Sequence, residues 1–155
     1  MSLQPPYITQ ATFCERVLSE KDGVLSAIRI IDTLNINVLP GTDVDGLVQK
    51  LDLLITIKSG DFNGEGTLKI RAIAPNGEPM KNGESITRMV LNGGVHGANV
   101  HISVGITVNV KGTYWYEISF NDRVLTRTPL SVSVTESQTL LPMTRTSLQK
   151  KAKAN

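Results

Sequence analysis

The residues best suited to metal chemistry lie in the acidic segment 61–66, Asp-Phe-Asn-Gly-Glu-Gly. Its oxygen-bearing side chains fall at positions 1, 3 and 5 of a calcium-binding loop, and glycine falls at position 6. Position 12, where a bidentate glutamate is required, is Ala72, so we interpret the segment as an acidic hairpin turn. A second acidic loop, 43–46, lies at the other end of an expected strand over 51–58, roughly 25 Å away. We therefore expect no shared metal ion.

The histidines and the cysteine do not form a recognisable centre. His96 and His101 are the two histidines and lie five residues apart, whereas a zinc site needs at least three protein ligands. We interpret both as surface residues. Cys14 is the single cysteine, so an intrachain disulfide is impossible. Arg16 could lower its pKa and make it reactive, but alternation places Cys14 on the same face as Ile8, which favours a buried, inert thiol.

Motifs that would indicate catalysis are missing from the sequence. It contains no Gly-x-Ser-x-Gly, no P-loop and no dinucleotide-binding fingerprint. The glycine-rich segment 92–97 precedes an expected strand, so it offers no helix N-terminus to an anion. We expect no enzymatic activity, no catalytic residues and no cofactor.

Trp115 is the candidate binding residue. It alternates with Tyr114 and Tyr116, so it should face the opposite side of its strand. An exposed tryptophan on a sheet face could stack on a sugar ring or form the centre of a protein contact. The alternative is a tryptophan covered by the loops of the chain itself.

The elements that must position these residues are strands. From Val100 to Val110 every second residue is apolar, which is typical of a strand half buried against a core. Four Asn-Gly pairs, at 63–64, 76–77, 82–83 and 92–93, predict tight turns. Between such signals we expect eight strands, over 7–14, 24–33, 51–58, 67–74, 85–91, 100–110, 113–120 and 124–134. Pro129 indicates an edge or a bulge in the last strand. Helix is limited to one short turn over 42–50.

Eight short strands with regular turns predict an all-β fold, a single immunoglobulin-like antiparallel β-sandwich with little or no helix. The segment 111–116, Lys-Gly-Thr-Tyr-Trp-Tyr, is similar to the Gly-x-Tyr start of strand F, where a tyrosine hydroxyl bonds back to the backbone. A plain hairpin through Lys111-Gly112 is the alternative. We expect residues 1–6 to be an extension that could be a cloning scar, residues 7–135 to be the sandwich, and residues 136–155 to be a mobile tail on which Leu140-Leu141 could dock.

The distribution of charged residues narrows the classes of partner that we expect. The 155 residues include 16 basic and 14 acidic residues, and the tail 136–155 holds four of the basic residues and one acidic residue. The body is therefore close to neutral, and we expect neither nucleic acid nor a membrane as a partner. Apolar runs are far shorter than the ~20 residues that cross a bilayer, and no signal peptide is evident. We expect a cytoplasmic protein.

Two short segments carry a family resemblance. Phe13-Cys14-Glu15 followed by Gly23-Val24-Leu25-Ser26 resembles the opening of a family of small bacterial proteins of unknown function. Its members usually have Asp where this chain has Glu15 and Lys where it has Val24. Gly112-Thr-Tyr114 and Pro129-Leu130-Ser-Val132 resemble the ending of that family. The resemblance implies an immunoglobulin-like β-sandwich, and it brings no activity and no site residues.

The sequence therefore establishes no specific function. We expect a non-catalytic interaction or structural module with a protein partner or self-association, because open sandwiches have edge strands and charged residues are scarce here. The alternative is binding of a small ligand or carbohydrate through Trp115.

Overall fold

The structure, a computed structural model, describes residues 4–107 and 110–137. These residues form strands and contain no helix, which confirms the all-β class. The strands are β1 (Tyr7–Ser19), β2 (Leu25–Ile31), β3 (Thr33–Val38), β4 (Val48–Ile73), β5 (Pro79–Thr107), β6 (Gly112–Phe120) and β7 (Arg123–Glu136). In the part of the chain described, no helix has the length and apolar character needed to cross a membrane. The expected tail beyond 137, including Leu140-Leu141, lies outside the described residues.

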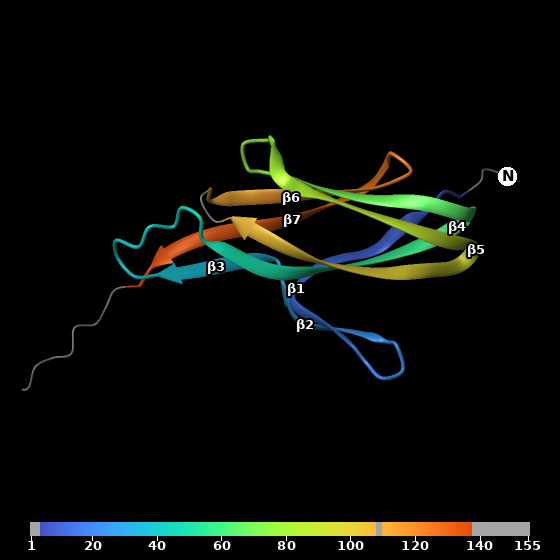
Figure 1. Ribbon diagram of the computed structural model, residues 1–155, viewed down its shortest axis with the longest axis horizontal. Helices are drawn as coiled ribbons and strands as arrows, with labels where there is room; N and C mark the ends of the chain where they lie inside the picture. The colour runs from blue at the N-terminus through green and yellow to red at the C-terminus, as the bar shows by residue number, and fades with distance from the viewer. Residues whose placement is uncertain (1–3, 108–109, 138–155) are drawn as a thin grey trace, which may run out of the picture.

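Two long strands replace four of the expected short ones. β4 has 26 residues and joins the segments 51–58 and 67–74, while β5 has 29 residues and joins 85–91 to most of 100–110. The expected breaks inside these two segments are therefore not present. Figure 1 shows β4 and β5 running side by side along the molecule.

Three of the four Asn-Gly pairs do not end a strand, contrary to the prediction that each marks a tight turn between strands. Only the pair 76–77 lies in a turn between strands, whereas the other three lie inside β4 or β5. The ladder of β4 with β5 shifts register on both sides of Gly60, and Gly60 and Gly64 have positive φ angles. These bulges bend the ribbon without ending it. The expected acidic hairpin at 61–66 is thus a bend within β4, and that interpretation was wrong.

Because of this bend, β4 belongs to two layers of a sandwich. Its first half pairs with β1 and its second half pairs with β6. We call layer one the set of β2, β1, residues 48–58 of β4 and 97–107 of β5. Layer two is residues 79–94 of β5, 60–73 of β4, then β6, β7 and β3. The main core lies between the layers, where for example the rings of Phe13 and Tyr116 meet edge to face at 4.8 Å.

The end of layer two contains a strand that sequence analysis missed. The expected strand 24–33 stops at Ile31, and the following residues form β3, which runs parallel to β7 from Thr33 opposite Ser131. Leu34 is buried in the main core. Pro129 precedes the part of β7 that β3 covers, so its missing N–H lies at an edge, as expected.

The connection between β5 and β6 crosses from one layer to the other. The end of β5 belongs to layer one and β6 belongs to layer two, so the hairpin alternative is wrong. The Tyr114 hydroxyl donates a hydrogen bond to the carbonyl of Val110 at 2.7 Å. This is the backbone-bonded tyrosine expected at the corner of an immunoglobulin-like sandwich.

The alternating stripe is confirmed in part. Val100, Ile102, Val104 and Ile106 pack in the main core, and His101 and Ser103 face outward. The strand ends at Thr107, however, and Val110 lies beyond it with 40 % of its surface exposed. Val108 lies outside the described residues.

Cys14 is buried, but not on the face expected. The pairing of β1 with β4 shifts register between Ile8 and Gln10. This bulge reverses the alternation, so Ile8 packs in the main core while Cys14 packs with Val17 and Leu54 in a second cluster on the other side of layer one.

Candidate functional site

The outer face of layer two carries a row of four charged residues that lie directly opposite one another on four adjacent strands. Glu84 of β5 pairs with Arg71 of β4, Arg71 pairs with Glu117 of β6, and Glu117 pairs with Arg127 of β7. Side chains at paired positions share a face of the sheet. The signs therefore alternate along the row, and we call these four residues the charge row.

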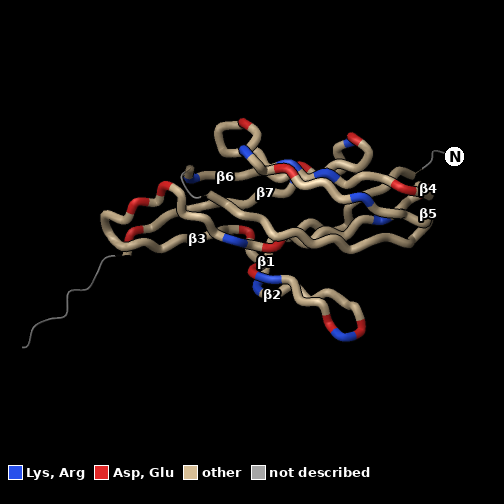
Figure 2. Tube along the Cα trace, viewed as in Figure 1, with Lys and Arg blue, Asp and Glu red and all other residues tan. Residues whose placement is uncertain are grey.

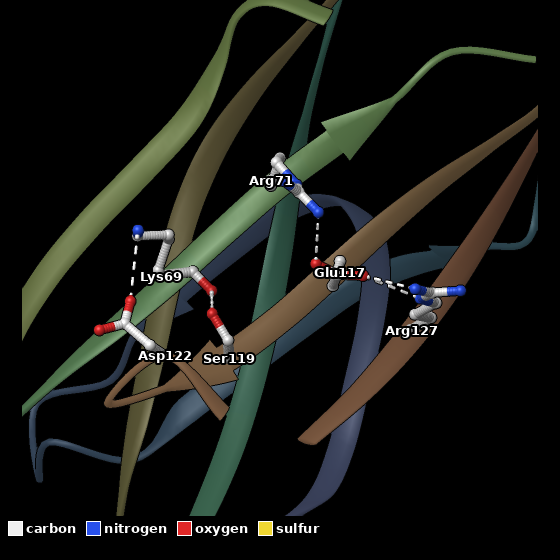
Figure 3. Close-up of polar contacts among 6 residues, drawn as sticks. All are labelled: Lys69, Arg71, Glu117, Ser119, Asp122 and Arg127. Atoms are coloured by element: carbon white, nitrogen blue, oxygen red, sulfur yellow. Dashed lines mark hydrogen bonds and ion pairs between the residues drawn. The ribbon is translucent and has the colours of Figure 1, made fainter. Parts of the chain in front are cut away.

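Glu117 is the centre of the charge row. Its carboxylate accepts hydrogen bonds from Nε and Nη2 of Arg127 at 3.0 and 2.7 Å and from Nη2 of Arg71 at 2.8 Å. Figure 3 shows the two guanidinium groups approaching it from opposite sides. The hydrogen bonds from Arg127 hold the pKa of Glu117 below its ordinary value, against the opposing effect of burial. The carboxylate therefore stays ionised and saturated, which suits a structural anchor better than a proton acceptor.

A second polar group flanks the charge row. Lys69 Nζ lies 3.6 Å from the Asp122 carboxylate, and the Ser119 hydroxyl donates to the Lys69 carbonyl at 3.4 Å (Figure 3). Asp122 belongs to the tight turn between β6 and β7, in which Asn121 and Asp122 both have positive φ angles. Since the Asp122 side chain is 91 % exposed, this ion pair contributes little to stability.

Trp115 lies on the other flank of the charge row, on the same face of β6 as Glu117. It pairs with Ile73 of β4 and Pro129 of β7. Tyr114 and Tyr116 are buried in the core, and Trp115 faces the opposite side of the strand, as expected, with 42 % of its surface exposed. Within residues 4–107 and 110–137, the loops therefore leave Trp115 partly exposed rather than covered.

The other residues singled out from the sequence are not brought together. His96 and His101 are exposed, and Cys14 is fully buried with its pKa raised by burial and by the nearby Asp52. Among the described residues, no three His, Cys, Asp or Glu side chains form a group that could hold a metal ion. Figure 2 shows acidic and basic positions mixed along the strands and at the tip of the β1–β2 hairpin.

Sequence analysis did not identify the charge row. The signal was present in each strand, since Glu117 alternates with buried Tyr116 and Ile118. What was missing is the register, because three separate strand pairings must be known before the four charges can be aligned.

Two solved structures match most of this chain at low sequence identity. An immunoglobulin-like protein from Pseudomonas aeruginosa is similar at 13% identity and a TM-score of 0.41, over 86% of this chain and 100% of that chain. The CARDB domain of a Pyrococcus furiosus protein, solved in complex with di-metal ions, is 11% identical with a TM-score of 0.41, over 86% of this chain and 93% of that chain.

A third solved structure is that of β-glucosidase 3B from Thermotoga neapolitana. It is 13% identical with a TM-score of 0.41, over 81% of this chain, which spans 16% of that enzyme. No curated protein matches the chain. A family model described as a family of unknown function, DUF6941, matches residues 9–133. The chain therefore belongs to the DUF6941 family, whose function is unknown.

Proposed function

We propose that this protein is a non-catalytic β-sandwich module that associates with a second copy of itself through the outer face of layer two. The observation that carries the proposal is the alternating sign of the charge row, Glu84, Arg71, Glu117 and Arg127. Such a row is complementary to its own reverse. A closed homodimer uses the same patch on both subunits, so a self-complementary patch is what that arrangement requires.

The symmetry can be stated geometrically. A two-fold axis in the interface, parallel to the strands and midway between β4 and β6, reverses the row in the second copy. Glu84 then lies over Arg127 of the second copy, and Arg71 lies over its Glu117. Opposite charges would meet at both ends of the row, where Glu84 and Arg127 are exposed, while Glu117 stays enclosed by its own two arginines. Such complementarity sets orientation and suppresses wrong partners.

Apolar positions on both flanks follow the same symmetry. The rotation brings Trp115 over Ile73 of the second copy, and it brings Ile86 over Val124. Ile86 and Val124 are 58 % and 47 % exposed, and Trp115 is 42 % exposed. Tryptophan and arginine are the residue types that most often dominate binding energy at protein interfaces. The face therefore supplies apolar area beside a charged band that sets the register.

Size-exclusion chromatography with light scattering tests the proposal. We expect the mass to rise from monomer to dimer across the micromolar range. Glu84→Arg should abolish the dimer, because the introduced guanidinium would lie over Arg127 of the second copy, and Arg127→Glu should abolish it by the reverse repulsion. Mixing these two variants should restore a dimer, because each mismatched position then meets its opposite charge.

Control variants distinguish loss of the dimer from unfolding of the subunit. Lys21→Glu, at the tip of the β1–β2 hairpin, should leave the dimer intact. If Arg127→Glu does not fold, Glu84→Arg alone remains informative, since high salt should partly restore its association. A strict monomer at all micromolar concentrations would contradict the proposal, as would a folded mixture that stays monomeric.

The exposure of Trp115 also keeps the alternative of a carbohydrate ligand open to a direct test. Acrylamide quenching of this single tryptophan should weaken as protein concentration rises if two copies cover it. If quenching does not depend on protein concentration but weakens when glucose is added, the result would instead favour the carbohydrate-binding alternative.

We further propose that the protein is bacterial and cytoplasmic, and that Phe13-Cys14-Glu15 and Gly112-Thr-Tyr114 are motifs of its family. The resemblance of these segments to small bacterial proteins supports the bacterial origin. The single cysteine is compatible with a reducing compartment such as the cytoplasm. Fractionation of an expressing bacterium, with detection of the untagged chain, tests the location.

A further inference from the structure

The strand β5 leaves an open edge along layer one. Among the described residues, both halves of β5 pair with β4 and with no other strand. In the half 97–107, the backbone N–H and C=O groups that point away from β4 therefore have no strand beside them. Such an edge is a template for pairing with a further strand, so folded proteins usually protect it with charged residues, proline, a bulge or a short length.

The half 97–107, which we call the free edge, has none of these protecting features. Its sequence contains no Asp, Glu, Lys, Arg or Pro, and its register with β4 runs without a shift along its whole length. Other edges are protected: β3 is only six residues long, and Arg29 within β2 has a positive φ angle. The remaining half of β5 carries three charged residues, Lys81, Glu84 and Arg88.

Apolar side chains of the free edge that face the core are incompletely buried. Val100, Ile102 and Val104 pack against the main core but are only half buried. Their direct partners on β4 are at most 2 % exposed. The difference arises because β4 has a strand on each side, whereas the free edge has a strand on one side. A further strand beside the free edge would complete the burial of these three side chains.

A groove of about 350 Å³ runs beside the free edge, between the two halves of β5. Residues 102–105 line one side of it and offer isoleucine and valine side chains. Residues 80–85 line the other side, where charged and hydroxyl groups come from Lys81, Glu84 and Ser85. Successive side chains of a strand point to opposite faces, so every second side chain of an added strand would enter this groove.

We propose that an extended peptide segment of a partner protein adds a strand to the free edge. Backbone hydrogen bonds along the strand supply the affinity in this mode of recognition, and the groove selects alternate side chains. The segment that fits has apolar residues at alternate positions, because these cover Val100, Ile102 and Val104. This site lies apart from the outer face of layer two and does not depend on the dimer proposed there.

A second copy of this chain fits the free edge less well than a single extended segment. Antiparallel pairing of two copies would place a two-fold axis at the free edge, and residues 80–85 lie just across the groove from it. The charged half of β5 in one copy would then lie beside the same half in the other. Burial of the charges of Lys81 and Glu84 there would be costly.

Hydrogen exchange followed by NMR tests the site with a synthetic peptide of the sequence 48–56, the segment of β4 that already pairs with β5. At a peptide concentration of ten times its Kd, exchange of the outward-pointing amides in 98–106 should slow about tenfold, because only about a tenth of the protein stays free. Amides already bonded to β4 should be unaffected. Protection should therefore appear at alternate residues, as strand addition requires.

Two variants and a control peptide isolate the contact. The same peptide with Leu53→Pro should give no protection, because proline removes a donor and interrupts strand pairing. In the protein, Val104→Lys places a charge beside the added strand and should weaken peptide binding about tenfold. Val95→Lys is the matched control on the same strand, since Val95 is 82 % exposed and lies outside the free edge. It should leave peptide binding unchanged.

The proposal is overturned if millimolar peptide gives no protection, or if the peptide with Leu53→Pro protects equally well. Protection confined to β2 or β3 would also overturn it. Protection of the free edge that rises with protein concentration alone would show that a second copy occupies it instead. If Val104→Lys does not fold, the two peptides decide the question on the wild-type protein. Arg127→Glu should lose the dimer and keep peptide binding, so the two proposals fail independently.

Discussion

Arg127 covers Glu117 on the outside of the sheet. The guanidinium donates two hydrogen bonds to the carboxylate, at 3.0 and 2.7 Å, and Glu117 retains only 7 % of its surface although it points away from the core. Arg71 completes the enclosure from the opposite strand at 2.8 Å. Removal of one member from such an enclosed group is destabilising, because it leaves the remaining charges unpaired.

Glu117→Gln should lower the free energy of unfolding by about 1–3 kcal/mol at neutral pH, because two arginines lose a charged acceptor. Urea unfolding followed by the fluorescence of Trp115 measures it. Glu84→Gln is the control, since Glu84 makes no ion pair within the described residues and should cost much less. Equal losses for the two variants would contradict the role assigned to Glu117.

The same pair predicts a pH dependence. Hydrogen bonding to Arg127 lowers the folded-state pKa of Glu117 from an ordinary value of 4.5. A lowered pKa stabilises the folded state above the unfolded-state pKa, and that stability is lost as pH falls through the lower, folded-state value. The stability difference between wild type and Glu117→Gln should therefore be constant at neutral pH and shrink below about pH 4.5. A difference that persists unchanged in strong acid would contradict this linkage.

Tyr114→Phe and Tyr116→Phe should have opposite effects on thermal stability. Loss of the Tyr114 hydroxyl removes a 2.7 Å hydrogen bond to the Val110 carbonyl and should cost about 1 kcal/mol. Loss of the Tyr116 hydroxyl removes a buried group without a partner in the described residues, so stability should be equal to or above that of wild type. Circular dichroism melting of both variants measures the contrast, and similar losses would refute it.

Cys14 should resist thiol reagents in the folded protein. Burial, followed by the charge of Asp52, raises its pKa, and the side chain has no exposed surface. Ellman's reagent at pH 8 should label the chain only after unfolding. A Cys14→Ala, Ser19→Cys variant should react at once, because Ser19 is exposed. Rapid labelling of native Cys14 would show that the second cluster opens readily.

Gly66→Ala should destabilise the packing of β4 against Phe120. A Cβ atom at this position would lie 2.0 Å from the ring of Phe120, which packs on the glycine. We expect a loss of about 1–3 kcal/mol, the usual cost of overpacking, and partial rescue by Phe120→Leu. Gly105→Ala is the control, since its Cβ would meet only Val48 at 3.4 Å. Differential scanning calorimetry compares them, and no rescue by Phe120→Leu would count against this packing explanation.

The sequence alone was sufficient for features that depend on neighbouring residues. Alternation placed Trp115 on the opposite face of its strand from Tyr114 and Tyr116, because a strand sends successive side chains to opposite faces. The same local rule indicated an all-β class. The tyrosine corner was also foreseeable, since the Gly-x-Tyr segment lies within a few residues of its acceptor.

Tertiary structure alone decided what depends on partners distant in the chain. The Asn-Gly pairs at 63–64 and 92–93 have the same local preference as the pair at 76–77, and only pairing of β4 with β5 shows that they bend strands rather than end them. The bulge near Thr9, which moved Cys14 to the other face, depends on the register with β4. The charge row likewise requires three strand pairings to be known. The alternation of side chains along a strand has a fixed period, so the sequence predicts which residues share a face of a strand. The register between strands is set by contacts across the whole fold, so only the structure shows which residues of different strands lie together.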